Sequence, residues 1–109
     1  MITAVLQRTP DPGLVELQHC VQPAARLLKL LASEQRLLLL CRLMEGETSV
    51  SDLAEHAALA QSATSQHLAK MRGEGLVATR REGQTIYYRL ADPNAAHILG
   101  ALSEIYRGK

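Results

Sequence analysis

The chain has 109 residues and a formal net charge of +1, which indicates one domain and argues against a general polyanion binder. Hydrophobic residues make up 47% of it, with no Trp or Phe and only three Tyr, so we expect an aliphatic core. A core of this size is modest, so burying a further apolar helix in an oligomer would stabilise the fold.

No segment is predicted to enter a membrane. The longest apolar run, LLLLC at 37–41, is flanked by Arg36 and Arg42, and MITAVLQRTPDPG at the N-terminus lacks a signal-peptide pattern. Two cysteines without an export signal are typical of a reducing compartment, so we expect a cytoplasmic protein with free thiols. No glycine-rich phosphate loop, HExxH motif or carboxylate pair with a nucleophile occurs, so we expect neither an enzyme nor a bound cofactor.

The first half of the chain is predicted to be helical. Residues 1–13 end in TPDPG and are expected to form a flexible tail ahead of a single domain at 14–109. Apolar spacing predicts a helix over 14–31 with a kink or restart at Pro23, and Ser33 is expected to cap a second helix at about 34–45. The apolar residues at helical spacing are Leu17, Val21, Ala24, Leu28 and Leu31 in the first helix, and those on one face of the second are Leu37, Leu40, Cys41 and Met44.

Two short helices are predicted next. Ser51 is expected to cap the third, within TSVSDLAEHAAL, and after a turn near Ala58 the fourth spans about 62–73. GEGLV ends the fourth helix, because Gly73 and Gly75 can each adopt a left-handed conformation. The inward positions of these helices are Leu53, Ala54, Ala57, Leu68 and Met71.

The last third of the chain predicts a hairpin and a helix. LVATRREGQTIYYRL is typical of two strands around a turn at Glu82-Gly83, and Asp92 followed by Pro93 begins a final helix. The predicted buried face of the hairpin consists of Ile86, Tyr88 and Leu90, and the helix has an apolar stripe of Ala96, Leu99, Leu102 and Ile105. Four helices, a hairpin and a helix predict a mainly α, winged helix-turn-helix fold that acts as a dimer.

The fourth helix opens with small polar residues that contribute little to helix stability. In a winged helix-turn-helix the N-terminal turns of this helix enter the major groove of double-stranded DNA, while the hairpin reaches the flanking backbone or the minor groove. Residues 61–89 carry five basic and two acidic side chains, which suits that contact, although polar residues on one helix can also be a plain solvated face. The predicted DNA-contacting residues are Gln61, Ser62, Thr64, Ser65, Gln66, Lys70, Arg72, Arg80, Arg81 and Gln84.

The segment SVSDLAEHAALAQSATSQHLAKMRGEGLVATRREGQTIYYRL resembles the ArsR/SmtB repressors, whose signature runs S…SxHLxxLRxxGLV…R.G…YYxL. The likeness extends from about Ala25 to Tyr106. The resemblance implies a homodimer that joins through its first and last helices and binds an operator, an inverted repeat in the DNA. It also implies repression that an inducer relieves.

The metal-binding positions of this family are largely missing here. Where the arsenic- and cadmium-type site needs a Cys-x-Cys pair, the third helix reads SVSDLA. The zinc-type site would have Asp92, but Asn94, Ile105 and Gly108 stand where the other ligands would be. We therefore expect no metal ligands, and we expect His97 to be a surface or partly buried histidine.

RLLLLCRLMEGE resembles the BigR/SqrR/HlyU-like branch, which senses reactive sulfur or oxidants and has a cysteine at the position of Cys41. The partner cysteine of that branch is replaced by Arg107. Three interpretations stay open: Cys20 pairs with Cys41, Cys41 senses alone, or sensing is lost and Cys41 is a core residue. The alternatives are a repressor that binds As(III) or another thiophilic metal, and one that is insensitive to thiol chemistry.

Overall fold

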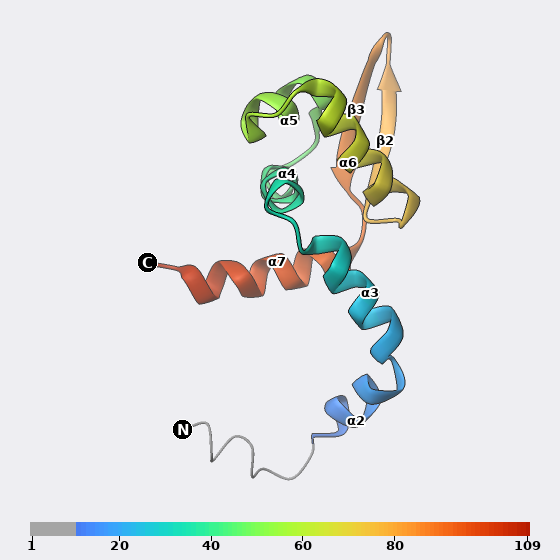
Figure 1. Cartoon of the computed structure of the whole chain (residues 1–109), viewed down its shortest axis with the longest axis vertical. Coiled ribbons are helices and arrows are strands. Elements are labelled where there is room, and N and C mark those ends of the chain that lie inside the picture. Colours follow the sequence, from blue (N-terminus) through green and yellow to red (C-terminus); the bar gives the residue numbers. More distant parts are fainter. Residues whose placement is uncertain (1–10) are drawn as a thin grey trace.

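A computed structural model describes residues 11–109 (Figure 1). The tail predicted for 1–13 lies outside the described residues over 1–10. Its last three residues are not a tail: the Asp11 side chain accepts a hydrogen bond from the Gly13 amide at 2.6 Å and caps helix α2 (Pro12–His19). Within the described residues, the first helix therefore begins at Pro12.

The first long helix is broken at Cys20, three residues before the predicted break at Pro23. Helix α2 ends at His19, Cys20 lies between the helices, and α3 spans Val21–Leu31. Pro23 occupies the third position of α3, within the first turn, where a backbone N–H has no acceptor inside the helix. A proline costs little there, so the predicted restart at Pro23 was wrong.

Helix α4 (Glu34–Met44) is capped by Ser33 as predicted, with the Ser33 hydroxyl accepting from the Arg36 amide. The cap predicted for helix α5 (Val50–Ala57) was wrong by two residues. Ser49, not Ser51, accepts a hydrogen bond from the Asp52 amide at 3.2 Å. Ser49 is extended because it belongs to β1 (Thr48–Ser49), a short strand that no local pattern indicated, and α5 begins where that strand ends.

Helix α6 (Gln61–Gly73) and the wing follow as predicted. Glycine is required after α6 at one position, because Gly75 has a φ of +81°. Strands β2 (Val77–Glu82) and β3 (Thr85–Leu90) pair antiparallel, and the two-residue turn is Gly83-Gln84, one residue later than expected. The sheet has the order β1-β3-β2, so β1 extends the predicted hairpin to three strands.

Helix α7 (Pro93–Tyr106) closes the chain and packs against α4. Asp92 caps it by accepting from the Asn94 amide at 2.8 Å, as predicted. Its buried positions are Ala95 and Leu99, whereas Ala96 is only half-buried and Ile105 is 56% exposed.

The core is aliphatic, as expected, and α4 lies at its centre. The largest fully buried side chains are Leu39, Leu40, Leu53, Leu68, Met71, Leu76 and Thr64. The apolar face predicted for α4 is only partly buried: Leu40 is buried, but Leu37 is only half-buried and Cys41 and Met44 are exposed. Leu37 to Leu40 make α4 apolar all round, so periodicity did not determine which side meets the core.

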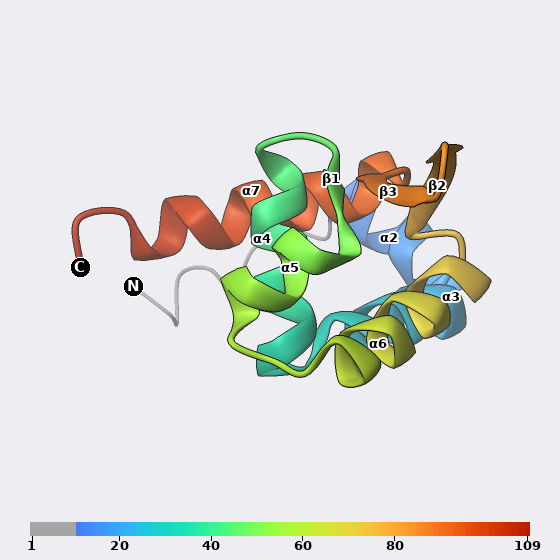
Figure 2. The same cartoon turned by 90° about the horizontal axis from the view of Figure 1, so that it is seen from above.

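Helices α2 and α3 project from this core in Figure 1, and α7 projects from it in both Figures 1 and 2. The radius of gyration is 16.6 Å, compared with about 13 Å for a compact domain of about 100 residues. No helix within residues 11–109 is long and apolar enough to cross a membrane.

Candidate nucleic-acid interface and cysteine groove

Helices α5 and α6 form the helix-turn-helix unit, and a side-chain contact joins their first turns. The Gln61 amide group donates a hydrogen bond to the Ser51 hydroxyl at 2.8 Å. Ala58, at the end of α5, has a φ of 54° and turns the chain toward α6. Gln61 therefore holds α6 against α5, a role that the sequence pattern did not indicate.

The exposed side of α6 is polar. Ser62, Ser65 and Gln66 are exposed and make no side-chain hydrogen bond to any other residue within 11–109, whereas Leu68 and Met71 on the opposite side are fully buried, as predicted. Lys70 and Arg72 are exposed at the end of the helix. Hydroxyl and amide groups without protein partners are available to base edges or phosphates.

Thr64 is not part of this exposed side, and its prediction as a DNA contact was wrong. It is 0% exposed, and its hydroxyl donates a hydrogen bond to the Ala60 carbonyl at 3.0 Å. Thr64 lies four residues before Leu68 and so belongs to the buried face of α6.

The wing presents two kinds of arginine. Arg81 and Gln84 are exposed and form no ion pair or side-chain hydrogen bond within 11–109. Arg80 instead bridges Glu82 at 2.7 Å and Glu47 at 2.8 Å, and its guanidinium lies 4.7 Å from the centre of the Tyr87 ring. The hydrogen bonds to Glu82 and Glu47 raise the pKa of Arg80 above its ordinary value, and its charge is largely balanced within the protein.

Cys41 lies in an apolar groove between α4 and α7, with a volume of about 420 Å³. Its thiol is free and exposed, so within one protomer Cys41 is not the buried core residue of the third interpretation. The other groove residues are Leu37, Leu99, Leu102, Ser103 and Tyr106. Covalent chemistry at Cys41 would therefore place atoms between two packed helices.

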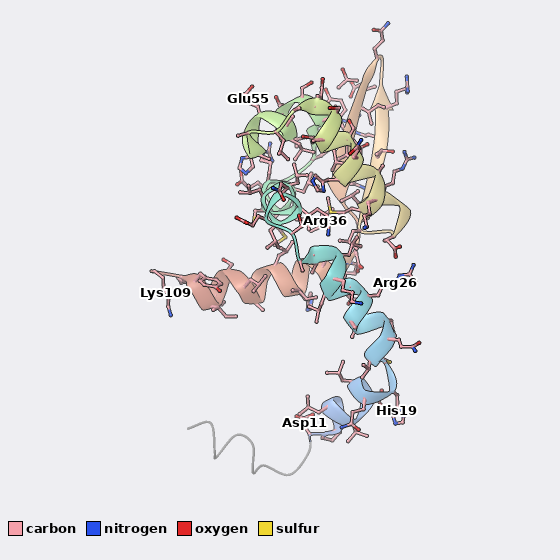
Figure 3. The ribbon with its side chains drawn as sticks, viewed as in Figure 1. Asp11, His19, Arg26, Arg36, Glu55 and Lys109 are labelled. Carbon is pink, nitrogen blue, oxygen red and sulfur yellow. The ribbon has the colours of Figure 1, made fainter. Side chains whose placement is uncertain are left out.

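Cys20 is also free and exposed, but it lies at the far end of α3 from α4. Figure 3 shows the neighbouring residue His19 at the junction of α2 and α3, away from the ribbons of α4 and α7. Cys20 lies at the start of α3, whose eleven residues span about 16 Å, whereas Cys41 lies on α4, which follows the other end of α3. A disulfide needs Cα atoms within roughly 7 Å of each other. Arg107 forms an ion pair with Glu104 at 2.9 Å, so a salt bridge stands where the second thiol of the sensing branch would be.

No group of three His, Cys, Asp or Glu side chains that could hold a metal ion occurs within residues 11–109. Asp92 serves as the cap of α7, and His97 is exposed on the same helix.

This arrangement defines a winged helix-turn-helix, a class of DNA-binding proteins. The family model for the bacterial regulatory proteins of the arsR family matches residues 33–79. The nodulation protein NolR of Rhizobium meliloti is 44% identical over 101 residues, which cover 93% of this chain and 83% of NolR. The transcriptional activator HlyU of Vibrio cholerae is 42% identical over 94 residues, which cover 86% of this chain and 87% of HlyU.

Solved structures agree with the sequence relatives. The transcriptional repressor BigR from Xylella fastidiosa superimposes with a TM-score of 0.82 and 37% identity, covering 86% of this chain and 96% of BigR. Reduced HlyU from Vibrio cholerae superimposes with a TM-score of 0.78 and 41% identity, covering 84% of this chain and 97% of HlyU. The chain belongs to the ArsR family, whose members are DNA-binding transcriptional regulators and not enzymes.

Proposed function

We propose that the chain is a repressor that binds a specific operator in double-stranded DNA. The observation that carries this proposal is the row of Ser62, Ser65 and Gln66 on α6, exposed and without partners within 11–109. These groups enter the major groove and read base edges, while Arg72, Arg81 and Gln84 contact the backbone on either side. Gln61 and Arg80 support the surface from within the protein and contribute less to the DNA contact.

The active form is a homodimer joined through α2, α3 and α7. These helices carry exposed large apolar side chains, which a monomer would leave in water. They are Leu14, Val15, Leu17, Val21, Leu28, Ile105 and Tyr106. A two-fold dimer presents two α6 helices, so the expected operator is an inverted repeat.

Thiol chemistry at Cys41 releases the DNA. The groove joins α4, which carries the core under α5 and α6, to α7, which belongs to the proposed dimer interface. Atoms added to Cys41 by reactive sulfur or an oxidant separate these helices and change the spacing of the two α6 helices. Cys20 pairs with Cys41 within one protomer only if α3 moves, so Cys41 is the primary sensing thiol.

A selection from random duplexes, followed by a fluorescence anisotropy titration, tests the DNA proposal. We expect the chain to enrich an inverted repeat, and Gln66→Ala to weaken binding to that duplex by about 5- to 150-fold, which corresponds to about 1–3 kcal/mol. His56→Ala is the matched control, because His56 is exposed on α5 and carries no proposed base contact. Absence of any enriched sequence would refute a sequence-specific regulator.

Intact mass and peptide mapping test the thiol proposal. Reduced protein is exposed separately to polysulfide, peroxide and arsenite, and DNA binding is measured on the same samples. We expect modification of Cys41 with loss of binding, and a Cys41→Ser variant that binds DNA equally well but no longer responds. A response that persists in Cys41→Ser would contradict this switch. Binding that only arsenite abolishes, without oxidation, would instead favour the thiophilic-metal alternative.

A further inference from the structure

Helix α3 carries basic residues on a different side from its exposed apolar residues. Successive residues on a helix point about 100° apart, so Arg26 lies about 140° from Val21 and about 160° from Leu28, and Lys29 lies about 80° and about 100° from them. Val21 and Leu28 are 53% and 56% exposed and belong to the proposed dimer interface. The basic side of α3 is left for a different contact.

That basic side faces the end of α6. The Arg26 guanidinium donates two hydrogen bonds to the Glu74 carboxylate, both at 3.0 Å, and Glu74 directly follows α6. Figures 1 and 2 show α3 beside the C-terminal end of α6. Arg26, Lys29, Lys70 and Glu74, with Leu30, line one open hollow of about 150 Å³. The ion pair therefore holds Lys29 of α3 close to Lys70 of α6.

The hollow has an unbalanced positive charge. Glu74 is already bound by Arg26, which lowers the pKa of its carboxyl and keeps it ionised. Neither Lys29 nor Lys70 forms an ion pair within residues 11–109, and both are exposed. Two ammonium groups without a carboxylate of their own suit a polyanion such as a phosphate backbone.

The hollow also continues the proposed DNA surface. Ser62, Gln66 and Lys70 recur every four residues along one side of α6, and the eight residues between the first and last cover about 12 Å. The DNA major groove is also about 12 Å wide. With Ser62 in the groove, this length would bring Lys70 to the groove edge, where the phosphates begin, and with it Lys29, which lines the same hollow.

We propose that Lys29, together with Lys70, binds backbone phosphates beside the recognition helix, so that α3 belongs to the DNA surface as well as to the dimer interface. This proposal rests on the proposed function. Lys29 adds affinity for any duplex and no base preference, because phosphate contacts carry no direct sequence information.

The test is the salt dependence of binding to the selected duplex and to an unrelated duplex, with wild type, Lys29→Gln, Lys29→Arg and Lys109→Gln. Each phosphate contact contributes about 0.9 to the slope of log Kobs against log [KCl]. We expect Lys29→Gln to reduce the slope by about 0.9 per protomer on both duplexes, and Lys29→Arg to retain it. Lys109, labelled in Figure 3 at the far end of α7, is the matched control and should leave the slope unchanged.

Sedimentation velocity on each variant shows whether the variant is still a dimer. An unchanged slope in folded, dimeric Lys29→Gln would overturn the proposal while leaving the proposed function intact. A Lys29→Gln variant that dissociates into monomers would also overturn it, because Lys29 would then act at the subunit interface. Wild-type protein that binds neither duplex would refute the proposed function itself.

Discussion

Thr64 and Ser65 are neighbours with similar hydroxyl groups and opposite environments. Thr64 is fully buried with its hydroxyl bound to the Ala60 carbonyl, whereas Ser65 is exposed and has no side-chain hydrogen bond within 11–109. Consecutive helical residues point about 100° apart. One step along α6 therefore separates a hydroxyl that bonds to the backbone from one that is available to DNA. Their chemistry is nearly the same, and only the packing of α6 separates them.

Alanine substitutions should separate these two roles. Thr64→Ala removes a buried methyl group and a hydrogen bond, and should lower the free energy of unfolding by about 1–2 kcal/mol. Ser65→Ala should leave stability nearly unchanged and weaken DNA binding. Urea unfolding and anisotropy titrations on both variants check this. Loss of DNA affinity in a fully folded Thr64→Ala, with none in Ser65→Ala, would contradict the assignment.

Arg80 and Arg81 provide the corresponding contrast within the wing. Arg80 and Tyr87 are cross-strand partners, and Arg80 also binds Glu47, 33 residues earlier in the chain. Arg80→Ala should therefore lower the thermal unfolding midpoint, with little change in the salt slope of DNA binding. Arg81→Ala should lower that slope by about 0.9 per protomer at unchanged stability. Thermal melts and salt titrations of both variants check this contrast. A lower salt slope in Arg80→Ala together with a lower unfolding midpoint in Arg81→Ala would contradict it.

The Arg26–Glu74 pair joins α3 to α6 and should make stability depend on pH. Because the folded pKa of Glu74 lies below its ordinary value of about 4.5, the pair stabilises the fold above that pH. This stabilisation is lost as the pH falls through the folded pKa and Glu74 becomes protonated. Glu74→Gln should thus melt below wild type at neutral pH, with the gap closing in acid. Glu45 has no ion pair within 11–109, so Glu45→Gln should melt at the same temperature as wild type across this pH range. A difference in melting temperature between Glu74→Gln and wild type that does not change with pH would argue against the pair.

The elements also show how far local patterns reach. The caps at Ser33 and Asp92 were predicted correctly, and the turn at Gly83-Gln84 was predicted within one residue. A cap or a turn depends on side chains only a few residues apart. The side of α4 that meets the core could not be predicted, because Leu37 to Leu40 surround the helix with apolar groups. Strand β1 was missed because its partner, β3, lies about 40 residues further along the chain.

At the scale of the whole molecule, the projecting α2, α3 and α7 helices predict a dimer. Leu28→Glu would place a charge in the proposed interface of both protomers, where an unpaired charge costs several kcal/mol. We expect this variant to sediment as a monomer at micromolar concentration and to lose most of its affinity for the inverted repeat. His56→Glu puts the same charge on the exposed side of α5 and should remain dimeric. A dimeric Leu28→Glu would move the interface away from this part of α3.

The sequence by itself determined the order of the main helices and of the hairpin, the caps at Ser33 and Asp92, the aliphatic core and the polar character of α6, because each follows from residue types at short spacing. The tertiary structure decided which hydroxyl on α6 is exposed, which wing arginine is free, and that Cys41 opens into a groove while Cys20 lies at the far end of α3. It also brought Arg26 into contact with Glu74, 48 residues further along the chain, and placed Lys29 and Lys70 around the same hollow. These outcomes depend on contacts between distant segments, and a local pattern in one segment carries no information about what the other segment supplies.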